Sequence, residues 1–191
     1  MQTSFTADQL SQAPIAEANG ILRACVHCGF CLSSCPTYAL TGDELDSPRG
    51  RIYLIKNMLE RGGAPDADTV HHIDRCLSCM SCLTACPSGV DYMHLVDTAR
   101  IHIQANHTRS IGMRLMRWFM ATVLPRPVAF RAALMAAKPL RLFRGLLPRP
   151  LRRLTEFAPE KIPPSVSLVG VHRAASKRVK RVAMLAGCVQ S

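Results

Sequence analysis

The sequence is poor in aromatic residues, and it lacks any long apolar run. Aromatic residues make up 5% of its 191 residues, so we expect an aliphatic core that is rich in methionine. The longest apolar stretch covers residues 118–124. A membrane-spanning helix needs roughly 20 apolar residues, so we predict no transmembrane helix. The first ten residues lack a basic region followed by an apolar one, and we expect no secretory signal.

Motifs for substrate chemistry are also missing. No G-x-G-x-x-G motif follows a predicted strand, so we predict no dinucleotide-binding site. We find no acid–base or nucleophile constellation and therefore expect no catalytic residues in this chain. Residues 1–110 show no convincing alternation of apolar and polar residues, which indicates that the first half is not built from strands.

Acidic residues are scarce in the second half of the chain. Residues 1–100 hold seven Lys or Arg and eleven Asp or Glu, whereas residues 101–191 hold seventeen and two. This contrast suggests two regions with different roles. For the basic region 109–155 we favour packing against other subunits or domains, followed by contact with an anionic membrane surface. Nucleic-acid binding is disfavoured because the arginines are scattered and Trp118 is the only tryptophan.

Cysteine, in contrast, is abundant and ordered. Eight of the nine cysteines fall in two groups that share the pattern C-x2-C-x2-C-x3-C-P and are offset by 51 positions. The first group is Cys25, Cys28, Cys31 and Cys35, and the second is Cys76, Cys79, Cys82 and Cys86. Without export, disulfides are disfavoured and metal ligation is the leading interpretation. The internal repeat indicates a duplicated unit.

The spacing favours two [4Fe-4S] clusters, each of which needs four thiolates. In two-cluster ferredoxins the fourth cysteine of such a run ligates the other cluster. We therefore predict that one cluster is held by Cys25, Cys28, Cys31 and Cys86, and the other by Cys76, Cys79, Cys82 and Cys35. The alternative is two zinc sites of four cysteines each. Zinc ribbons usually show separated C-x2-C pairs, which makes zinc the weaker interpretation.

The 40 residues between the two groups have a helical pattern. Ser47 and Pro48 form a typical helix start, and Gly62-Gly63 a typical end. Apolar residues recur at helical spacing in this helix at Ile52, Ile55, Met58 and Leu59, and in a helix starting at Asp91 at Leu95, Val96, Ala99 and Ile103. Further helices are expected over 16–24 and 66–75. This favours a mainly α fold: an all-helical two-cluster module of the kind used by respiratory dehydrogenase subunits.

We divide the chain into three parts. Residues 1–108 form the predicted two-cluster domain. Residues 109–178 form a basic extension of short helices broken by prolines, followed by a linker. Residues 179–191 resemble the first buried strand of an α/β domain, which has no partner strand here. We therefore expect the chain to be part of a longer one.

Several single residues allow two interpretations. Cys188 is either a cluster ligand of a further domain or a small buried apolar residue. His27 could tune a cluster, but a partly exposed loop residue is the default, and His71 and His72 are expected on a helix surface. Arg49 and Arg51 lie in a first helical turn, where the dipole disfavours cations. They either have a role in docking or charge compensation or are solvated, and the solvated interpretation is slightly favoured.

Longer runs resemble the iron–sulfur subunit of glycolate oxidase. They are CVHCGFCLSSCPTYALTGDELDSPRGRIYLIK from Cys25, HIDRCLSC from His72, CPSGVDYMHLVDTAR from Cys86 and the terminal VAMLAGCVQ. DELDSPRGR is the segment that favours glycolate oxidase over related subunits of lactate or glycerol-3-phosphate dehydrogenases and of heterodisulfide reductase. Members of the family continue into a further region with Cys-Cys-Gly motifs, and this chain stops near its first residues.

The resemblance implies an oxidoreductase complex in which a separate FAD-binding subunit oxidises glycolate to glyoxylate. Electrons would pass through the two clusters of this chain towards a membrane acceptor such as quinone. The implied location is cytoplasmic, at the face of the inner membrane. A metal-bearing binding module without electron transfer is the alternative from a different functional class.

Overall fold

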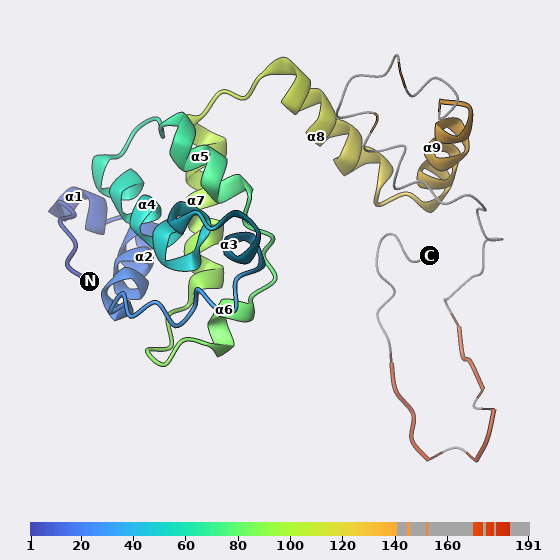
Figure 1. Ribbon diagram of the computed structural model, residues 1–191, viewed down its shortest axis with the longest axis horizontal. Helices are drawn as coiled ribbons and strands as arrows, with labels where there is room; N and C mark the ends of the chain where they lie inside the picture. The colour runs from blue at the N-terminus through green and yellow to red at the C-terminus, as the bar shows by residue number, and fades with distance from the viewer. Residues whose placement is uncertain (141–144, 146–151, 153–169, 174, 178, 184–191) are drawn as a thin grey trace. The chain divides into compact units, whose positions relative to one another are not determined.

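The computed structural model describes residues 1–140, 145, 152, 170–173, 175–177 and 179–183. The chain divides into two compact units, Met1–Thr108 and Arg109–Ser191. The described residues form helices and contain no strand, so the predicted mainly α class is confirmed. Figure 1 shows the order of the elements along the chain.

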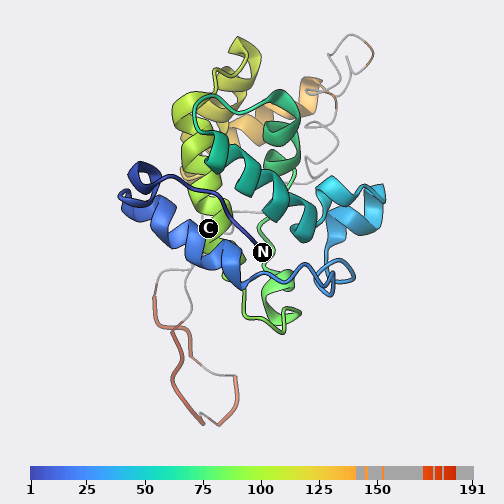
Figure 2. The same ribbon diagram turned by 90° about the vertical axis from the view of Figure 1, so that its left-hand side faces the viewer.

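The first unit contains seven α-helices and one 3-10 turn. They are α1 (Ala7–Leu10), α2 (Ala13–Ala24), α3 (Pro36–Thr41), η1 (Glu44–Asp46), α4 (Pro48–Arg61), α5 (Ala67–Asp74), α6 (Ser81–Thr84) and α7 (Tyr92–Asn106). Helices α2, α4 and α5 pack against α7, and η1 packs against the start of α4. Figure 2 shows this arrangement after a quarter turn.

The local signals in the sequence place the starts of α4, α5 and α7 correctly. At the start of α4 the Ser47 side chain accepts a hydrogen bond from the Gly50 amide, and Gly62 ends the helix with a positive φ of 67°. Asp66 and Asp91 cap α5 and α7 in the same way. Helix α2 begins at Ala13, earlier than predicted, with a proline in its first turn.

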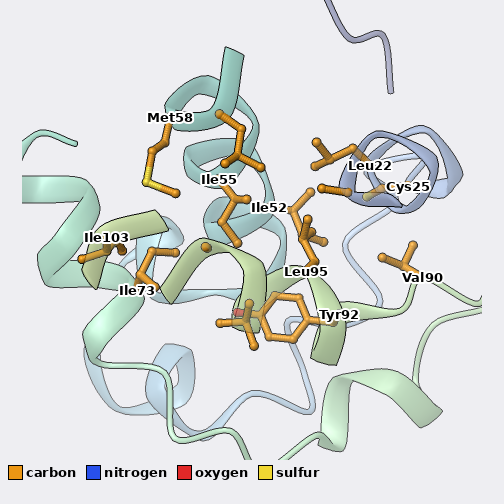
Figure 3. Packing of buried hydrophobic residues seen from close by; sticks show 14 of the residues in the cluster. Leu22, Cys25, Ile52, Ile55, Met58, Ile73, Val90, Tyr92, Leu95 and Ile103 are labelled. Carbon is orange, nitrogen blue, oxygen red and sulfur yellow. The ribbon is translucent and has the colours of Figure 1, made fainter. Parts of the chain in front are cut away.

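The core of this unit is aliphatic, as the composition predicts. All eight apolar residues predicted on the two core-facing helices are buried: Ile52, Ile55, Met58, Leu59, Leu95, Val96, Ala99 and Ile103. Leu22, Ile73 and the aromatic ring of Tyr92 pack into the same cluster (Figure 3). The core therefore lies where α2, α4, α5 and α7 meet, and both cysteine loops border it through Cys25, Cys76, Cys82 and Cys86.

One close backbone approach positions the start of α4. A Cβ atom at Gly50 would lie 2.0 Å from the Glu44 carbonyl oxygen and 2.8 Å from its carbonyl carbon. Only glycine therefore allows η1 to lie against the first turn of α4. This contact places Asp46 beside α4.

The second unit contains α8 (Ile111–Val123) and α9 (Pro127–Leu140), which pack against each other. Pro125 lies between them, as expected of a helix breaker, whereas α9 continues through Pro139 to its last residue. In the described part of the chain, no helix is both long and apolar enough to cross a bilayer.

The predicted final strand lies largely outside the described residues. Residues 179–183 are exposed and belong to no helix or strand. Residues 184–191, which include Cys188, lie outside the described part, as does most of the predicted linker 156–178.

Candidate metal centres

The two cysteine loops repeat each other in backbone conformation as well as in sequence. Loop 1 (residues 25–35) has positive φ at His27 (58°) and Gly29 (85°), and loop 2 (residues 76–86) has it at Ser78 (52°) and Met80 (58°). These two pairs are related by the same offset of 51 positions as the cysteines. Residues other than glycine seldom adopt this conformation. Turns with such residues direct successive amide N–H groups to one side and form anion-binding concavities, of the kind found at iron–sulfur sites.

Loop 1 borders a hollow that is open to solvent, which we call the first hollow. Its cysteines are Cys25, Cys28, Cys31, Cys82 and Cys86. Three of these belong to loop 1 and two to loop 2. The four cysteines that the sequence predicts for one cluster therefore all line this hollow.

A second hollow, also open to solvent, is lined by Cys35, Cys76, Cys79 and Cys82. These are the four cysteines that the sequence predicts for the other cluster, with Cys35 contributed by loop 1. The two hollows share Pro48, Cys82 and Tyr92 in their walls, so they adjoin each other. The chain therefore brings all eight cysteines together around two neighbouring spaces.

The donor set fits iron–sulfur clusters, which are held by thiolates. Burial raises the pKa of the Cys82 thiol to about 11 and also raises the pKa of Cys31. In contrast, hydrogen bonds from Ser81 lower the pKa of Cys79. Ligation needs thiolates, so loading of the sites releases protons and becomes more favourable as pH rises.

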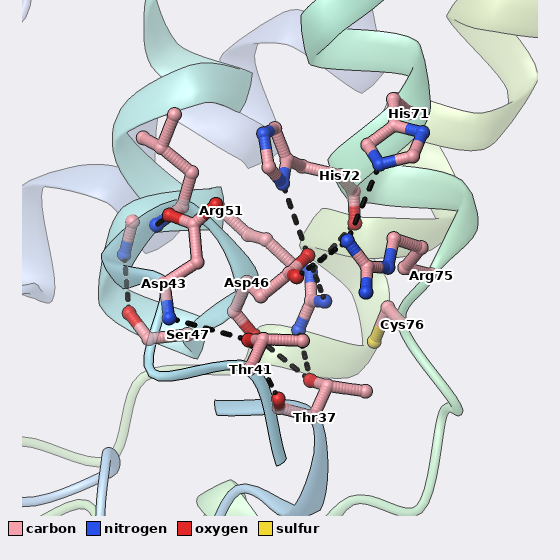
Figure 4. A network of polar contacts seen from close by, with 12 residues as sticks. Thr37, Thr41, Asp43, Asp46, Ser47, Arg51, His71, His72, Arg75 and Cys76 are labelled. Atoms are coloured by element: carbon pink, nitrogen blue, oxygen red, sulfur yellow. Dashed lines mark hydrogen bonds and ion pairs between the residues drawn. The ribbon is translucent and has the colours of Figure 1, made fainter. Parts of the chain in front are cut away.

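A buried network of charged residues lies beside the second hollow (Figure 4). Asp46 is fully buried, and its Oδ1 lies 3.2 Å from Arg51 Nη2 and 3.0 Å from His72 Nδ1. Arg75 Nη1 lies 2.9 Å from the other carboxylate oxygen. Asp43, Asp46 and His72 have ligand atoms within 4.8 Å of one another. Two arginines already hold Asp46, so we interpret this group as an ion-pair network and not as a metal site.

The network reaches the cysteines through Arg51. Its Nη1 lies 3.0 Å from Thr37 Oγ1 and 3.9 Å from Cys35 Sγ, and its Nε donates to the His72 carbonyl oxygen at 2.7 Å. Arg51 thereby connects the end of loop 1 to α5, the helix that leads into loop 2. The network holds Cys35 close to the loop that supplies the other three cysteines of the second hollow.

Two predictions about these residues were wrong. The slightly favoured interpretation of Arg51 as a solvated residue fails because it is 1% exposed, and the expected surface position of His72 fails because it is 8% exposed. The D-x4-R spacing of Asp46 and Arg51 is the local signal for this pair. Nothing local in the sequence connects His72 to a carboxylate 26 positions earlier.

Arg49 and His27 lie at the first hollow. Arg49 is part-exposed, pairs with Glu44 at 2.8 Å and donates to the His27 carbonyl oxygen at 3.4 Å. His27 is part-buried in its loop, as expected, and contacts the Tyr53 ring edge to face. Burial and the neighbouring Arg49 lower the pKa of His27, which favours the neutral ring.

Comparisons with known proteins agree with this geometry. Residues 21–90 match the 4Fe-4S dicluster domain family. The chain is 44% identical over its whole length to the glycolate oxidase iron–sulfur subunit of Escherichia coli (strain K12) and covers 44% of that protein. It is 46% identical over 99 residues to a "probable glycolate oxidase iron-sulfur subunit" of Bacillus subtilis (strain 168), covering 51% of this chain and 22% of that one.

A more distant relative is an iron–sulfur protein of the CoB–CoM heterodisulfide reductase of Methanopyrus kandleri. It is 30% identical over 89 residues, which are 46% of this chain and 43% of that protein. No solved structure matches. The chain spans less than half the length of these relatives.

The comparisons confirm the predicted resemblance and agree with two [4Fe-4S] clusters. The assignment of individual cysteines to each cluster stays a prediction. Residues 21–90 are similar to the 4Fe-4S dicluster domain family, and the chain as a whole is similar to the iron–sulfur subunit of glycolate oxidase.

Proposed function

We propose that this chain is the electron-transfer subunit of a glycolate-oxidising complex and holds its two clusters by crossed ligation. One observation carries the proposal: in each of two adjoining hollows, three cysteines of one loop lie together with the C-P cysteine of the other loop, and Cys82 lines both hollows. In this arrangement Cys86 completes the set of loop 1, and Cys35 completes the set of loop 2. Crossed ligation would link loop 1 to loop 2 through each cluster, so each cluster would also stabilise the fold.

A bound [4Fe-4S] cluster accepts and returns one electron. The chain's own residues hold two such groups side by side, because Pro48, Cys82 and Tyr92 line both hollows. Buried side chains such as Tyr92 and Ile52 keep water from the inner walls. The adjoining placement supports electron transfer from one site to the other.

Each hollow has a cysteine that is open to the surroundings. Cys28 is exposed beside Val26 and Phe30, which are 67% and 65% exposed. Cys79 is exposed beside Leu77, which is 65% exposed. An exposed ligand with apolar neighbours suits electron exchange with a docked partner. We assign these two surfaces to a FAD-binding subunit that oxidises glycolate and to an acceptor at the cytoplasmic face of the membrane.

The metal content tests the cofactor. The anaerobically purified 191-residue chain should contain about eight irons and eight sulfides, with an EPR spectrum of two interacting clusters after dithionite reduction. Zinc without sulfide, in a preparation never exposed to oxygen, would contradict the proposal. That outcome would favour a structural metal-binding module.

Serine variants test the crossing. Cys35→Ser should disturb the same EPR signal as Cys76→Ser, and Cys86→Ser the same signal as Cys25→Ser. Cys188→Ser is the matched control and should leave both signals intact. Pairing of Cys35 with Cys25 in this assay would refute crossed ligation while leaving the two-cluster content unaffected.

The substrate is tested with the whole complex, captured anaerobically from membranes through a tag on this chain. Added glycolate should bleach the cluster absorbance, and lactate and glycerol 3-phosphate should bleach it less. Faster bleaching by lactate or by glycerol 3-phosphate would instead assign the chain to a lactate or a glycerol-3-phosphate dehydrogenase. No bleaching by any of the three would refute the assignment to such a complex.

A further inference from the structure

The surroundings of the two hollows differ in which groups contact sulfur, and the following inference rests on the crossed ligation proposed above. At the second hollow, Arg51 Nη1 and Thr37 Oγ1 lie 3.9 Å and 3.2 Å from Cys35 Sγ. A thiolate cannot donate a hydrogen bond. A Cys35 thiolate would therefore be the acceptor of any hydrogen bond to either group. The Thr37 hydroxyl also donates to the Asp46 carbonyl oxygen at 2.8 Å, so its one proton is shared between that oxygen and the sulfur.

Tyr92 adds a donor at another sulfur of the same hollow. Its hydroxyl lies 3.6 Å from Cys76 Sγ, and the residue is 4% exposed. Arg100 donates to Ser78 Oγ at 2.6 Å and to the Cys76 carbonyl oxygen at 2.8 Å. This places a further cation on the same loop.

The network around Asp46 also brings a cation to the second hollow. Arg51 and Arg75 both pair with the buried Asp46 carboxylate, and a carboxylate oxygen of the exposed Asp43 lies within 4.8 Å of the ligand atoms of Asp46 and His72. Arg51 is the member of this network that lines the hollow, with its Nη1 3.9 Å from Cys35 Sγ.

The first hollow has fewer side-chain hydrogen-bond donors near its cysteine sulfurs. Among the described residues, side-chain hydrogen bonds to a cysteine sulfur reach only cysteines of the second hollow: Cys35, Cys76 and, through Ser81, Cys79. At Cys31 of the first hollow the hydrogen bonds come from backbone amides, its own and that of Arg49. The Arg49 side chain is neutralised by Glu44, and the Met1 ammonium binds the carbonyl oxygen of Cys25, not a sulfur.

Reduction adds negative charge to a cluster and its thiolates. Hydrogen bonds to the sulfurs and nearby cations stabilise that charge and raise the reduction potential. We propose that the cluster held by Cys35, Cys76, Cys79 and Cys82 has the higher potential of the two. Electrons then enter at the first hollow and pass to the second. The surface around Cys28 and Phe30 receives the electron donor, and the surface around Cys79 and Leu77 serves the acceptor.

The test measures both potentials by EPR-monitored redox titration of the full chain with both clusters bound. Tyr92→Phe and Thr37→Val each remove a hydroxyl near a second-hollow sulfur and preserve most of the side-chain shape. Each should lower the higher potential and leave the other one unchanged. Tyr53→Phe and Thr41→Val are the matched controls. Tyr53 is 49% exposed, the Thr41 hydroxyl donates to the Thr37 carbonyl oxygen, and both variants should leave the two potentials unchanged.

Arg51 is a poorer target because its loss would leave the buried Asp46 short of a partner and could prevent folding. Cys35→Ser and Cys86→Ser identify the signals independently. The higher-potential signal should change in Cys35→Ser and persist in Cys86→Ser. The reverse assignment would overturn the proposal.

Two further outcomes would also overturn the inference: equal effects of Tyr92→Phe on both potentials, or no effect on either. Both outcomes are compatible with eight irons and crossed ligation, so they contradict the unequal potentials alone. A chain without iron and sulfide, or one in which Cys35 pairs with Cys25, would instead contradict the proposed function.

Discussion

Replacing Asp46 by asparagine tests the buried network beside the second hollow. The substitution keeps the size and one oxygen acceptor but removes the charge that faces Arg51, His72 and Arg75. Arg75 is 42% exposed and can be resolvated by water. Arg51 is 1% exposed and cannot, so its charge stays buried without this carboxylate.

Breaking a buried ion pair by removing one partner costs about 3–5 kcal/mol. A domain of this size has a total unfolding free energy of about 5–15 kcal/mol, so the variant loses a large part of its stability. The midpoint of thermal unfolding, followed by far-UV circular dichroism of the cluster-bearing chain, should fall by more than about 10 °C. Asp43→Asn is the control: Asp43 is exposed and caps η1, and asparagine caps equally well, so the change should stay within about 0.5 kcal/mol.

The pH dependence has a defined sign. Burial alone would raise the pKa of Asp46, but the hydrogen bond from His72 and the charges of Arg75 and Arg51 outweigh it and lower the pKa. A lowered carboxyl pKa stabilises the fold above the unfolded pKa of about 4, and this stabilisation is lost as pH falls further. The difference between the wild-type chain and Asp46→Asn should therefore shrink in acid.

A double variant separates charge from packing. Asp46→Asn combined with Arg51→Met removes both charges, and should recover part of the stability lost in the single variant. A single variant as stable as Asp43→Asn would refute the buried-charge argument. A double variant no more stable than the single one would show that shape, and not charge, holds this region.

Three other measurements test separate parts of the structure. Gly20→Ala should stabilise the chain by about 0.5–1 kcal/mol, because α2 has open space at this position. Gly50→Ala should destabilise it by about 1–3 kcal/mol, because the added Cβ would clash with the Glu44 carbonyl group. Equal melting temperatures of these two variants would contradict the close approach of η1 to α4. Asp66→Ala removes the cap of α5 and should cost about 1 kcal/mol at neutral pH. Hydrogen bonds from Thr69 and Arg61 lower the pKa of Asp66 to about 2, so this cost should fade between about pH 4 and pH 2, and a cost that persists below pH 2 would refute the cause. Alkylation of the cluster-bearing chain, followed by mass spectrometry, should modify at most Cys188. The eight loop cysteines should be modified only after the clusters are removed. Rapid labelling of loop cysteines in the intact protein would contradict their ligation.

The helical framework could be predicted from the sequence because its signals are local. Ser47 with Pro48 starts α4, and Gly62 ends it. The apolar faces of α4 and α7 are buried because each repeats at helical spacing over several turns. The cysteine pattern is equally local, and its repetition at a fixed offset predicts two equivalent loops.

The buried charges could not be predicted because their burial depends on partners from other elements. His72 lies on the short helix α5, and nothing in the sequence of this helix indicates a carboxylate partner. Its partner is Asp46 of η1, which lies 26 positions earlier in the chain. Left-handed Ser78 and Met80 were also missed, since nothing in either residue type favours a positive φ. The one indication in the sequence is Gly29 of loop 1, the counterpart of Met80, because glycine readily adopts a positive φ.

The start of α4 explains why two arginines lie where a helix dipole disfavours them. Pro48 lines both hollows, Arg49 lines the first and Arg51 the second, so this helix end faces both thiolate sets. Thiolates are anions, and a helix N-terminus attracts anions through its free amide groups and its dipole. Once thiolates lie there, the field at the arginines combines the repulsion of the dipole with the attraction of several negative sulfurs. The cysteine thiolates therefore stabilise the two arginines in this first turn, and the same turn borders both hollows.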